Sequence, residues 1–319
     1  MSLVSRYRDR LPIGPATPDV SLGEGGTPLL RAPRLSEELG CELWLKWEGA
    51  NPTGSFKDRG MTVAVAKAAE DGADAVVCAS TGNTSASAAA YAARAGLRAV
   101  VLLPAGGVAL GKLAQARATG ASLLEVQGSF DEALEAAREL GRRGTHVLVN
   151  SLNPHRLEGQ KTAAFEVVEQ LGATPDVLAL PYGGGGNTRA YALGFAELGA
   201  SPQLLAVQAA SRDRTAATAI RIATPAHRDQ AEAAADVVTV DDDALLAAWR
   251  DLARLEGLFC EPASAAGLAG LRARRPAPAS RVVCVLTGHG LKDPAAVDAT
   301  APPPVPVAPD PDAIAAAAR

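Results

Sequence analysis

The sequence predicts an α/β fold with open, mostly parallel sheets that helices cover on both faces. Short runs of β-branched and other apolar residues recur along most of the chain, and stretches of helical periodicity, each about 10–15 residues long, separate them. Strands that read as continuous apolar runs are typical of parallel sheets buried on both faces. The chain shows no internal repeat at the periods of solenoid proteins.

The first predicted elements lie on either side of a loop at 51–60. The segment 26–30 and the turn after it are expected to cover one edge of a sheet, and 42–47 has the alternating, aromatic-rich pattern of a strand. Helical periodicity follows at 61–69. The loop therefore connects a strand to a helix, and its proline and glycine residues mark it as a turn.

Strands and helices then alternate in two series. The first has strands at 75–78, 98–103, 122–126 and 146–149, and helices at 80–96, 110–119 and 130–142. The second has strands at 177–180, 204–208, 237–240 and 282–286, and helices at 156–171, 188–198, 215–222, 241–256 and 262–272. The proline- and alanine-rich tail at 301–319 is expected to be loose, with a helical turn in its final alanines, and we assign it no function.

The composition indicates a globular protein without a broad charged surface. With 319 residues and 48% hydrophobic content, the chain can bury a large core. The net charge of -4, from 31 basic and 35 acidic residues, gives no extended basic patch for nucleic acid or anionic membrane. Four cysteines lie far apart, without metal-ligand spacing, and we expect reduced thiols, with Cys78 and Cys284 buried on strands.

The chain carries no pattern typical of secretion or membrane insertion. Residues 1–10 include three arginines, and no apolar segment of a signal peptide follows. The longest largely apolar stretch, 86–103, is interrupted by Ser87, Arg94 and Arg98. We expect a cytoplasmic protein that does not interact with membranes.

Lys57 lies in the loop at 51–60, between Phe56 and Asp58. A lysine amine forms a Schiff base with an aldehyde once desolvation or neighbouring cations lower its pKa, and Phe56 with the surrounding backbone supplies such an environment. We expect Asp58 to cap the following helix. Most lysines, however, are solvated surface charges, so the other loops must support this interpretation.

Two further loops follow strands and open helices. Ser80, Thr81, Asn83 and Thr84 present hydroxyls and an amide at a helix N-terminus, where free N–H groups attract a carboxylate or phosphate; the alternative is an ordinary helix cap. In the segment 181–188, four successive glycines allow the backbone to close around an anion. These phosphate-cradle candidates are Gly183, Gly184, Gly185, Gly186, Asn187 and Thr188. The segment is neither a Walker A loop nor a Rossmann fingerprint, and a flexible connector is the alternative.

Two more segments follow strands. Asn150 and Arg156 could supply an amide and a planar cation to a second phosphate, although a solvated arginine at a helix start is the ordinary interpretation. Thr287 follows the last strand, and its hydroxyl could donate to a ring nitrogen. His289 is a candidate base, but one histidine in a glycine turn is more often structural.

Together these segments resemble the threonine synthase branch of the fold-type II pyridoxal-phosphate (PLP) enzymes. Pro-Thr-Gly-Ser-Phe-Lys-Asp-Arg-Gly at 52–60 is similar to the cofactor-lysine segment, and the likeness continues in order to Thr-Gly-His-Gly-Leu-Lys-Asp-Pro at 287–294. The resemblance implies a tryptophan synthase β-like fold with two open, mostly parallel twisted sheets and an active site between two domains. The smaller domain, 41–150, would carry the lysine, and the larger, 1–40 and 151–300, the glycine loop.

The resemblance also implies roles for the site residues. Lys57 would hold pyridoxal 5'-phosphate as a Schiff base, Asn83 would bind its ring oxygen, Gly183 to Thr188 its phosphate, and Thr287 its pyridine nitrogen. The family's substrate is O-phosphohomoserine. Its α-carboxylate would be bound by Ser80, Thr81 and Thr84, and its phosphate by Lys57, Thr84, Asn150 and Arg156.

The implied reaction is a γ-elimination followed by β-hydration. Lys57 would remove the α-proton while PLP accepts the electrons, the β-proton and γ-phosphate would leave, and water would add at Cβ to give threonine. A homodimer is the family expectation. The region before 26 looks too short for the segment of members activated by S-adenosylmethionine, so we expect no such activation.

The sequence departs from the family in two places. The family's glycine loop often reads Gly-Asn-Ala-Gly-Asn, whereas 183–187 reads Gly-Gly-Gly-Gly-Asn, and the segment 211–214 after Gln208 looks shortened. Three alternatives therefore stay open. The chain could act on O-phosphoserine by β-replacement, as a cysteate synthase does, it could be a threonine or serine dehydratase, or it could be a non-catalytic PLP-binding protein.

Overall fold

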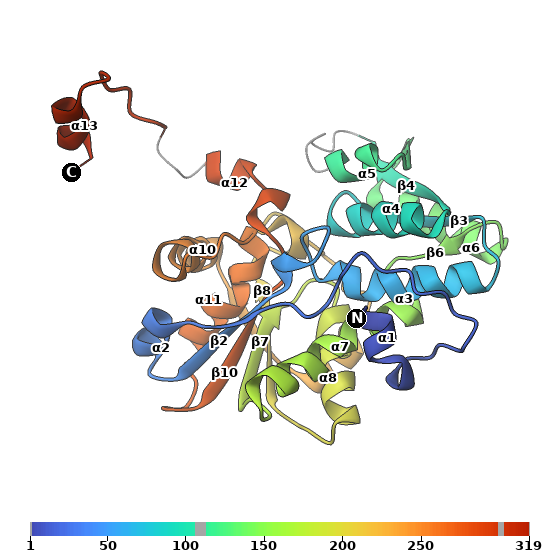
Figure 1. The fold of residues 1–319 in the computed structure, drawn as a ribbon, viewed down its shortest axis with the longest axis horizontal. Helices are drawn as coiled ribbons and strands as arrows, with labels where there is room; N and C mark the ends of the chain where they lie inside the picture. The colour runs from blue at the N-terminus through green and yellow to red at the C-terminus, as the bar shows by residue number, and fades with distance from the viewer. Residues whose placement is uncertain (1, 106–112, 299–302, 319) are drawn as a thin grey trace.

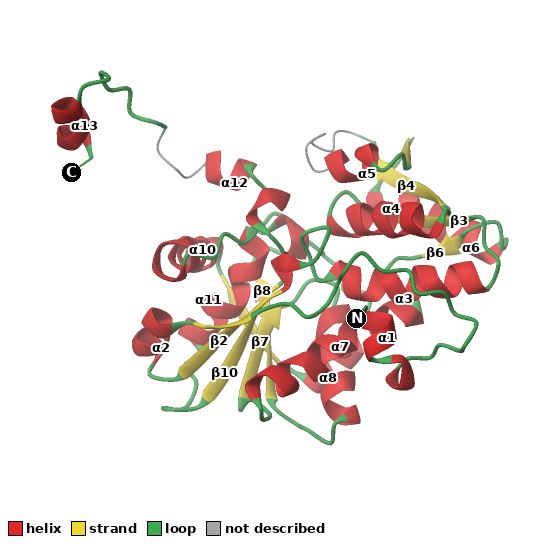
Figure 2. Ribbon diagram, in the orientation of Figure 1, coloured by secondary structure: helices red, strands yellow, loops and turns green. Residues whose placement is uncertain are grey.

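Residues 2–105, 113–298 and 303–318 are described in the computed structural model of the protein, which is built on two sheets (Figures 1 and 2). The larger sheet has the strand order β1-β2-β10-β7-β8-β9, in which only β1 runs antiparallel to its neighbour. Its strands are β1 (Leu29–Arg31), β2 (Glu42–Trp47), β7 (Val177–Pro181), β8 (Gln203–Ala209), β9 (Asp236–Val240) and β10 (Arg281–Leu286). The smaller sheet is parallel throughout, in the order β5-β4-β3-β6. Its strands are β3 (Ala75–Ala79), β4 (Arg98–Pro104), β5 (Ser122–Val126) and β6 (Val147–Leu148). These sheets confirm the predicted fold class.

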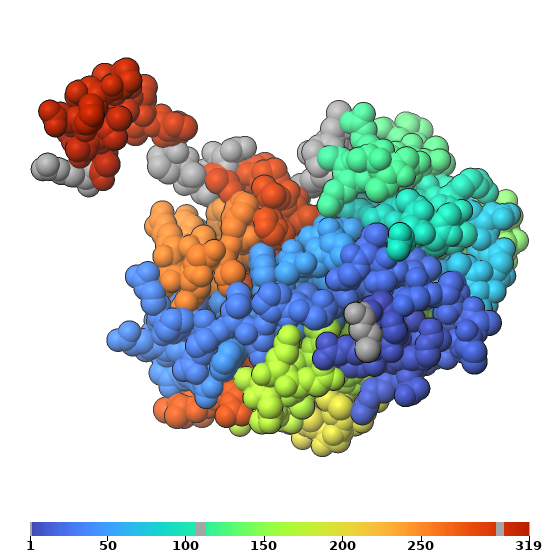
Figure 3. Space-filling view, in the orientation of Figure 1, coloured from blue at the N-terminus to red at the C-terminus, as the bar shows by residue number. Residues whose placement is uncertain are grey.

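Helices cover both faces of each sheet. The α-helices of the described residues are α1 (Leu3–Arg6), α2 (Pro33–Leu39), α3 (Lys57–Glu70), α4 (Asn83–Ala95), α5 (Ala114–Ala118), α6 (Phe130–Arg142), α7 (Pro154–Leu171), α8 (Gly186–Glu197), α9 (Arg228–Ala234), α10 (Asp242–Glu256), α11 (Ala266–Ala273), α12 (Ala295–Asp298) and α13 (Pro311–Ala317). Figure 3 shows α13 standing apart from the body of the molecule. The helical turn expected near the C-terminus is therefore present.

Alternate strand residues face opposite helix layers, as the two-residue period of a strand requires. In the larger sheet, Leu43 packs with α2, α10 and α11, whereas Val283 packs with α7 and α8. In the smaller sheet, Cys78 packs with α3 and α4, whereas Val77 packs with α6. This double coverage explains why the strands read as continuous apolar runs. All four cysteines are buried and free, as expected.

Helices α3 and α7 pack directly against each other where the two sheet layers meet, and glycines make this close approach possible. A Cβ added at Gly159 of α7 would lie 2.0 Å from the Arg59 carbonyl oxygen, and one added at Gly60 of α3 would lie 2.5 Å from the Arg156 carbonyl oxygen. No other residue fits at these two positions without moving a helix. The crossing brings the first turns of α3 and α7 together.

The predicted helix at 215–222 is wrong. The structure has only a 3-10 turn there, Thr218–Ile220, and forms a helix later, at α9. The Thr215 hydroxyl and the Ala216 N–H both donate to the Asp242 carboxylate, and these bonds hold the segment in a non-helical course.

The predicted domain boundary at residue 41 is wrong for one strand. Strand β2, which that boundary assigned to the smaller domain, pairs with β1 and β10 in the larger sheet. Part of the helix predicted at 110–119 lies outside the described residues, and α5 forms within the remainder. Within the described ranges, no helix is both long and apolar enough to cross a membrane.

Candidate active site

Lys57 is the first residue of α3, and its side chain is partly buried. Its Nζ lies 4.3 Å from the centre of the Phe56 ring. Burial and the neighbouring Arg156 cation lower the pKa of the Lys57 amine to about 7, although the Glu261 carboxylate opposes this shift. A large share of the amine is therefore neutral, and nucleophilic, near neutral pH.

Asp58 does not cap α3, in contrast to our expectation. Its buried carboxylate accepts from the Thr53 N–H at 2.7 Å, from the Thr53 hydroxyl at 2.6 Å and from the Ser87 hydroxyl at 2.6 Å. These donors lie outside the first turn of α3. Asp58 therefore closes the loop that precedes Lys57 and ties α3 to α4.

One cavity is lined by residues from four of the loops singled out in the sequence, 51–60, 80–84, 181–188 and 287–294. It lies outside the carboxyl ends of β3, β7 and β10, where α/β sheets collect ligands. The residues that line it are Phe56, Asn83, Pro181, Gly183, Gly184, Gly185, Gly186, Asn187, Thr188, Ala219, Ile220, Glu261 and Thr287. Every residue proposed to contact the cofactor, apart from Lys57 itself, is in this lining, and Lys57 follows directly on Phe56.

The glycine loop forms an open cradle at the start of α8. Gly185 has φ +83°, and a Cβ there would lie 3.0 Å from the His227 carbonyl oxygen, so this position requires glycine. The Asn187 Nδ2 and Thr188 Oγ1 atoms are buried and lack a hydrogen-bond partner among the described residues. The first N–H groups of a helix have no partner within it. These unpaired donors match the needs of a phosphate.

Arg156, in the first turn of α7, provides a second place for an anion. Its side chain is fully buried, and its Nη1 donates to the Val149 carbonyl at 2.8 Å. Its Nε and Nη2 have no partner in the part of the chain that is described. Burial lowers the pKa of Arg156 to about 10, so it stays charged at neutral pH. A buried cation with two unused donors calls for an anionic partner.

Asn150 is already bound to the protein backbone. Its Oδ1 accepts from the Ala79 N–H at 3.0 Å, and its Nδ2 donates to the Ala79 carbonyl at 2.9 Å. The side chain thus fixes the end of β3, from which the segment 80–84 departs. The expected substrate residues Ser80, Thr81 and Thr84 are partly buried at the start of α4.

Glu261 is a site residue that sequence reasoning missed. Its buried carboxylate lines the cavity and accepts from Asn83 Nδ2 at 3.0 and 3.2 Å. A Cβ at Gly288 would lie 2.3 Å from Glu261 Oε1, which explains the glycine there. Burial raises the pKa of Glu261 to about 7, against the Asn83 hydrogen bond and the charge of Lys292. In the sequence, an acidic residue before Pro262 gives no signal beyond a helix start.

In the last predicted segment, 287–294, Thr287 lines the cavity and His289 does not. Thr287 lines the cavity, with its Oγ1 3.1 Å from the Ser264 Oγ. His289 lies outside the lining, where its Nδ1 accepts from the Leu291 N–H and its ring packs near Trp47 and Phe259. These contacts agree with the structural interpretation of His289.

Comparisons with known proteins identify the family. Residues 20–288 match the family described as "Pyridoxal-phosphate dependent enzyme". The chain is similar to the threonine synthase of Synechocystis sp., with 52% identity over 92% of this chain and 83% of the relative. It is also similar to the threonine synthase of Mycobacterium tuberculosis strain H37Rv, with 50% identity over 96% of this chain and 93% of the relative.

A solved structure shares the fold. Maize serine racemase superposes with a TM-score of 0.76 over 86% of this chain and 91% of that one, at 21% identity. Identity that low supports the architecture and no finer statement. The family match and the sequence relatives show that the chain belongs to the pyridoxal-phosphate-dependent enzymes, in their threonine synthase branch.

Proposed function

We propose that this protein is a threonine synthase, a lyase that converts O-phospho-L-homoserine and water to L-threonine and phosphate. The cofactor of the family is pyridoxal 5'-phosphate. When bound, it supplies an electron sink that makes protons on a substrate amino acid removable. The relatives at about half identity carry this activity in their names, and they match most of the chain.

The residues around the cavity fit this cofactor. The Lys57 amine, with its pKa of about 7, is suited to attach to the aldehyde. The unpaired Asn187 and Thr188 side chains and the first N–H groups of α8 would hold the phosphate. Asn83 and Thr287 would bind the ring oxygen and the ring nitrogen.

The Arg156 guanidinium is the observation that best supports a phosphorylated substrate. It is fully buried, and two of its donor atoms are unpaired among the described residues. A dehydratase acting on free threonine or serine would leave this charge uncompensated, which is costly in a buried place. A substrate phosphate would pair with it in the fork geometry that arginine favours. Ser80, Thr81 and Thr84 would hold the α-carboxylate at the start of α4.

Lys57 would also move protons during the reaction. An amine with a pKa of about 7 is divided between its neutral and charged forms at neutral pH, so it can both accept and return a proton. Arg156 would stabilise the charge of the departing phosphate. On the family resemblance we also expect a cytoplasmic homodimer.

Phosphate release separates the candidate substrates. Purified protein with pyridoxal phosphate would be assayed with O-phosphohomoserine, O-phosphoserine and free threonine, with identification of the products. We expect phosphate and threonine from O-phosphohomoserine alone. Phosphate released from O-phosphoserine and not from O-phosphohomoserine would instead indicate loss of a β-phosphate, the step that β-replacement shares with β-elimination, and rapid deamination of threonine would indicate a dehydratase.

A variant of Arg156 tests the phosphate site in the same assay. Arg156→Gln keeps polar donors but loses the charge, and we expect kcat/KM for O-phosphohomoserine to fall by about 100-fold, a typical cost of losing a charged phosphate contact. The variant should still bind pyridoxal phosphate, which the cofactor absorbance reports. A kcat/KM equal to that of the wild type would remove Arg156 from substrate binding.

A further inference from the structure

Three successive carbonyl groups of the glycine loop are bound from outside the cavity. The Gly183 carbonyl accepts from Arg212 Nη2 at 2.7 Å. The Gly184 carbonyl accepts from the His227 N–H at 3.0 Å, and the Gly185 carbonyl accepts from the Arg189 N–H at 3.0 Å. The N–H groups of Gly184, Gly185 and Gly186 have no hydrogen-bond acceptor among the described residues.

The planarity of the peptide bond determines where the N–H groups that follow these three carbonyls point. A trans peptide is planar, so the carbonyl of one residue and the N–H of the next point in opposite directions. The described part of the chain has no cis peptide. Holding the carbonyls of Gly183, Gly184 and Gly185 on one side therefore turns the following three N–H groups to the other side, and all three following residues line the cavity.

Arg212 is the only side chain among these three donors, and each of its three guanidinium nitrogens donates a hydrogen bond. Nε donates to the Ile222 carbonyl at 2.9 Å, Nη1 donates to Gln208 Oε1, and the planar group lies 4.9 Å from the centre of the Tyr182 ring. Arg212 thus joins the end of β8 to the start of the glycine loop and to Ile222. A hydrogen bond from a cation also polarises the Gly183–Gly184 peptide, which makes the Gly184 N–H a stronger donor.

The His227 backbone N–H, which binds the Gly184 carbonyl, is held in place by contacts of the His227 side chain. Its Nε2 lies 3.0 Å from the Ser151 carbonyl, which can only accept, so Nε2 carries the proton. Its Nδ1 lies 3.4 Å from Arg189 Nη1, which can only donate, so the ring is neutral. Burial and the nearby cations Arg189 and Lys57 lower the pKa of His227, in agreement with that assignment. The imidazole fixes the backbone N–H that binds Gly184.

We propose that Arg212, supported by His227, is a positioning residue for the cofactor phosphate, because it aims the N–H groups of the four-glycine loop into the cavity. This inference rests on the proposed function, since it assumes that the bound anion is the phosphate of pyridoxal phosphate. It also gives a role to the segment 211–214, the place where the chain looks shortened relative to its family. Four glycines in a row offer no side chain to shape the loop, so its shape depends on donors outside it.

A comparison of two ligands tests the proposal without any measurement of turnover. Apo protein would be titrated with pyridoxal phosphate and with pyridoxal, which has the same aldehyde and ring but no phosphate. In Arg212→Met the stem remains and the donors are lost. We expect about 10- to 100-fold weaker binding of pyridoxal phosphate, with pyridoxal binding unchanged. Arg212→Lys, which keeps the charge and one flexible donor, should recover part of the loss.

Arg214→Met is the matched control, because Arg214 is two residues away with its side chain 83% exposed. It should bind both ligands as the wild type does. Equal losses of both ligands in Arg212→Met, or no loss of either, would overturn the proposal, and so would a failure of Arg212→Lys to recover any affinity. Circular dichroism identifies a variant that has not folded, in which case the Lys variant decides. If the wild type binds neither ligand, the proposed function itself fails.

Discussion

At the scale of single residues, the site depends on how charges are balanced around Lys57. Arg156 disfavours the protonated amine, whereas Glu261 favours it. Glu261 is itself surrounded by Asn83, Lys57, Lys292 and Asp293, and burial raises its pKa to about 7. The Lys57 amine and the Glu261 carboxyl therefore titrate in the same range, so a change in the charge of one alters the titration of the other.

Removing the Glu261 charge should move the titration of Lys57. Because the carboxylate stabilises the protonated amine, Glu261→Gln should lower the pKa of Lys57, so the neutral amine should form at lower pH. The rate at which apo protein develops cofactor absorbance on mixing with pyridoxal phosphate should rise with a midpoint near pH 7 in the wild type and at lower pH in the variant. Glu125→Gln, on the exposed side of β5, is the control. A wild-type midpoint near the ordinary lysine pKa, about 10.4, would contradict the predicted environment.

At the scale of elements, the crossing of α3 and α7 positions both Lys57 and Arg156. Each residue lies in the first turn of its helix, and Gly60 and Gly159 let the two helix backbones touch. Asn153 caps α7 by accepting from the His155 N–H at 2.9 Å, and Pro154 follows it, so the sequence fixes where Arg156 falls in the first turn.

A methyl group at this crossing should destabilise the protein. Alanine in a helix interior is intrinsically favoured over glycine by about 1 kcal/mol. At Gly159, however, the new Cβ would lie 2.0 Å from the Arg59 carbonyl oxygen, a backbone atom that cannot rotate away. We expect Gly159→Ala to lose about 1–3 kcal/mol of unfolding free energy, measured by urea denaturation. Gly14→Ala, where the nearest atom is 3.7 Å away, should change little. A Gly159→Ala variant as stable as the wild type would show that the helices separate easily.

Sequence patterns predicted most helices and strands but not the parts that depend on distant residues. Continuous apolar strands and capped helices were predicted to within a few residues, because their signals are local. The helix at 215–222 was wrong because Thr215 bonds to Asp242, a partner 27 residues away. The roles of Glu261 and Arg212 were missed for the same reason, since each depends on a residue that only the fold brings near.

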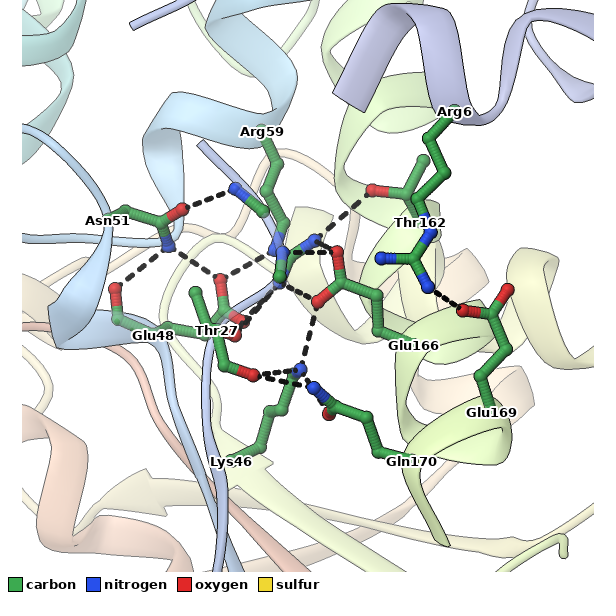
Figure 4. A network of polar contacts seen from close by, with 12 residues as sticks. Arg6, Thr27, Lys46, Glu48, Asn51, Arg59, Thr162, Glu166, Glu169 and Gln170 are labelled. Atoms are coloured by element: carbon green, nitrogen blue, oxygen red, sulfur yellow. Dashed lines mark hydrogen bonds and ion pairs between the residues drawn. The ribbon is translucent and has the colours of Figure 1, made fainter. Parts of the chain in front are cut away.

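At the scale of the whole molecule, a buried ionic network joins α3 to α7 and to β2 with the turn that follows it (Figure 4). Arg59 of α3 binds Glu48 at 2.7 Å and Glu166 of α7 at 2.6 Å, and Lys46 of β2 binds Glu166 at 2.9 Å. The N–H of Gly26, before β1, also donates to Glu166, at 2.7 Å. The two carboxylates balance the charges of the two cations. Displacing any one of them would leave a buried charge unpaired, so the network specifies how the layers meet.

This network was not visible in the sequence. Its charged members come from three separate segments, 46–48, 59 and 166, and each alone reads as an ordinary charged residue. The resemblance ordered the loops along the chain, and the residues it assigns to the cofactor line the cavity or directly follow a lining residue, whereas no residue of 150–156 is in the lining. Its domain boundary failed at β2, whose antiparallel and parallel neighbours are both in the larger sheet.

The central claim is that Lys57 carries pyridoxal phosphate. Protein mixed with the cofactor would be reduced with borohydride, which makes a lysine–cofactor bond permanent, and digested for peptide mass spectrometry. We predict the added mass on Lys57, with no cofactor absorbance in Lys57→Ala and normal absorbance in Lys67→Ala on the same helix. Addition to another lysine, or absorbance that survives in Lys57→Ala, would contradict the account.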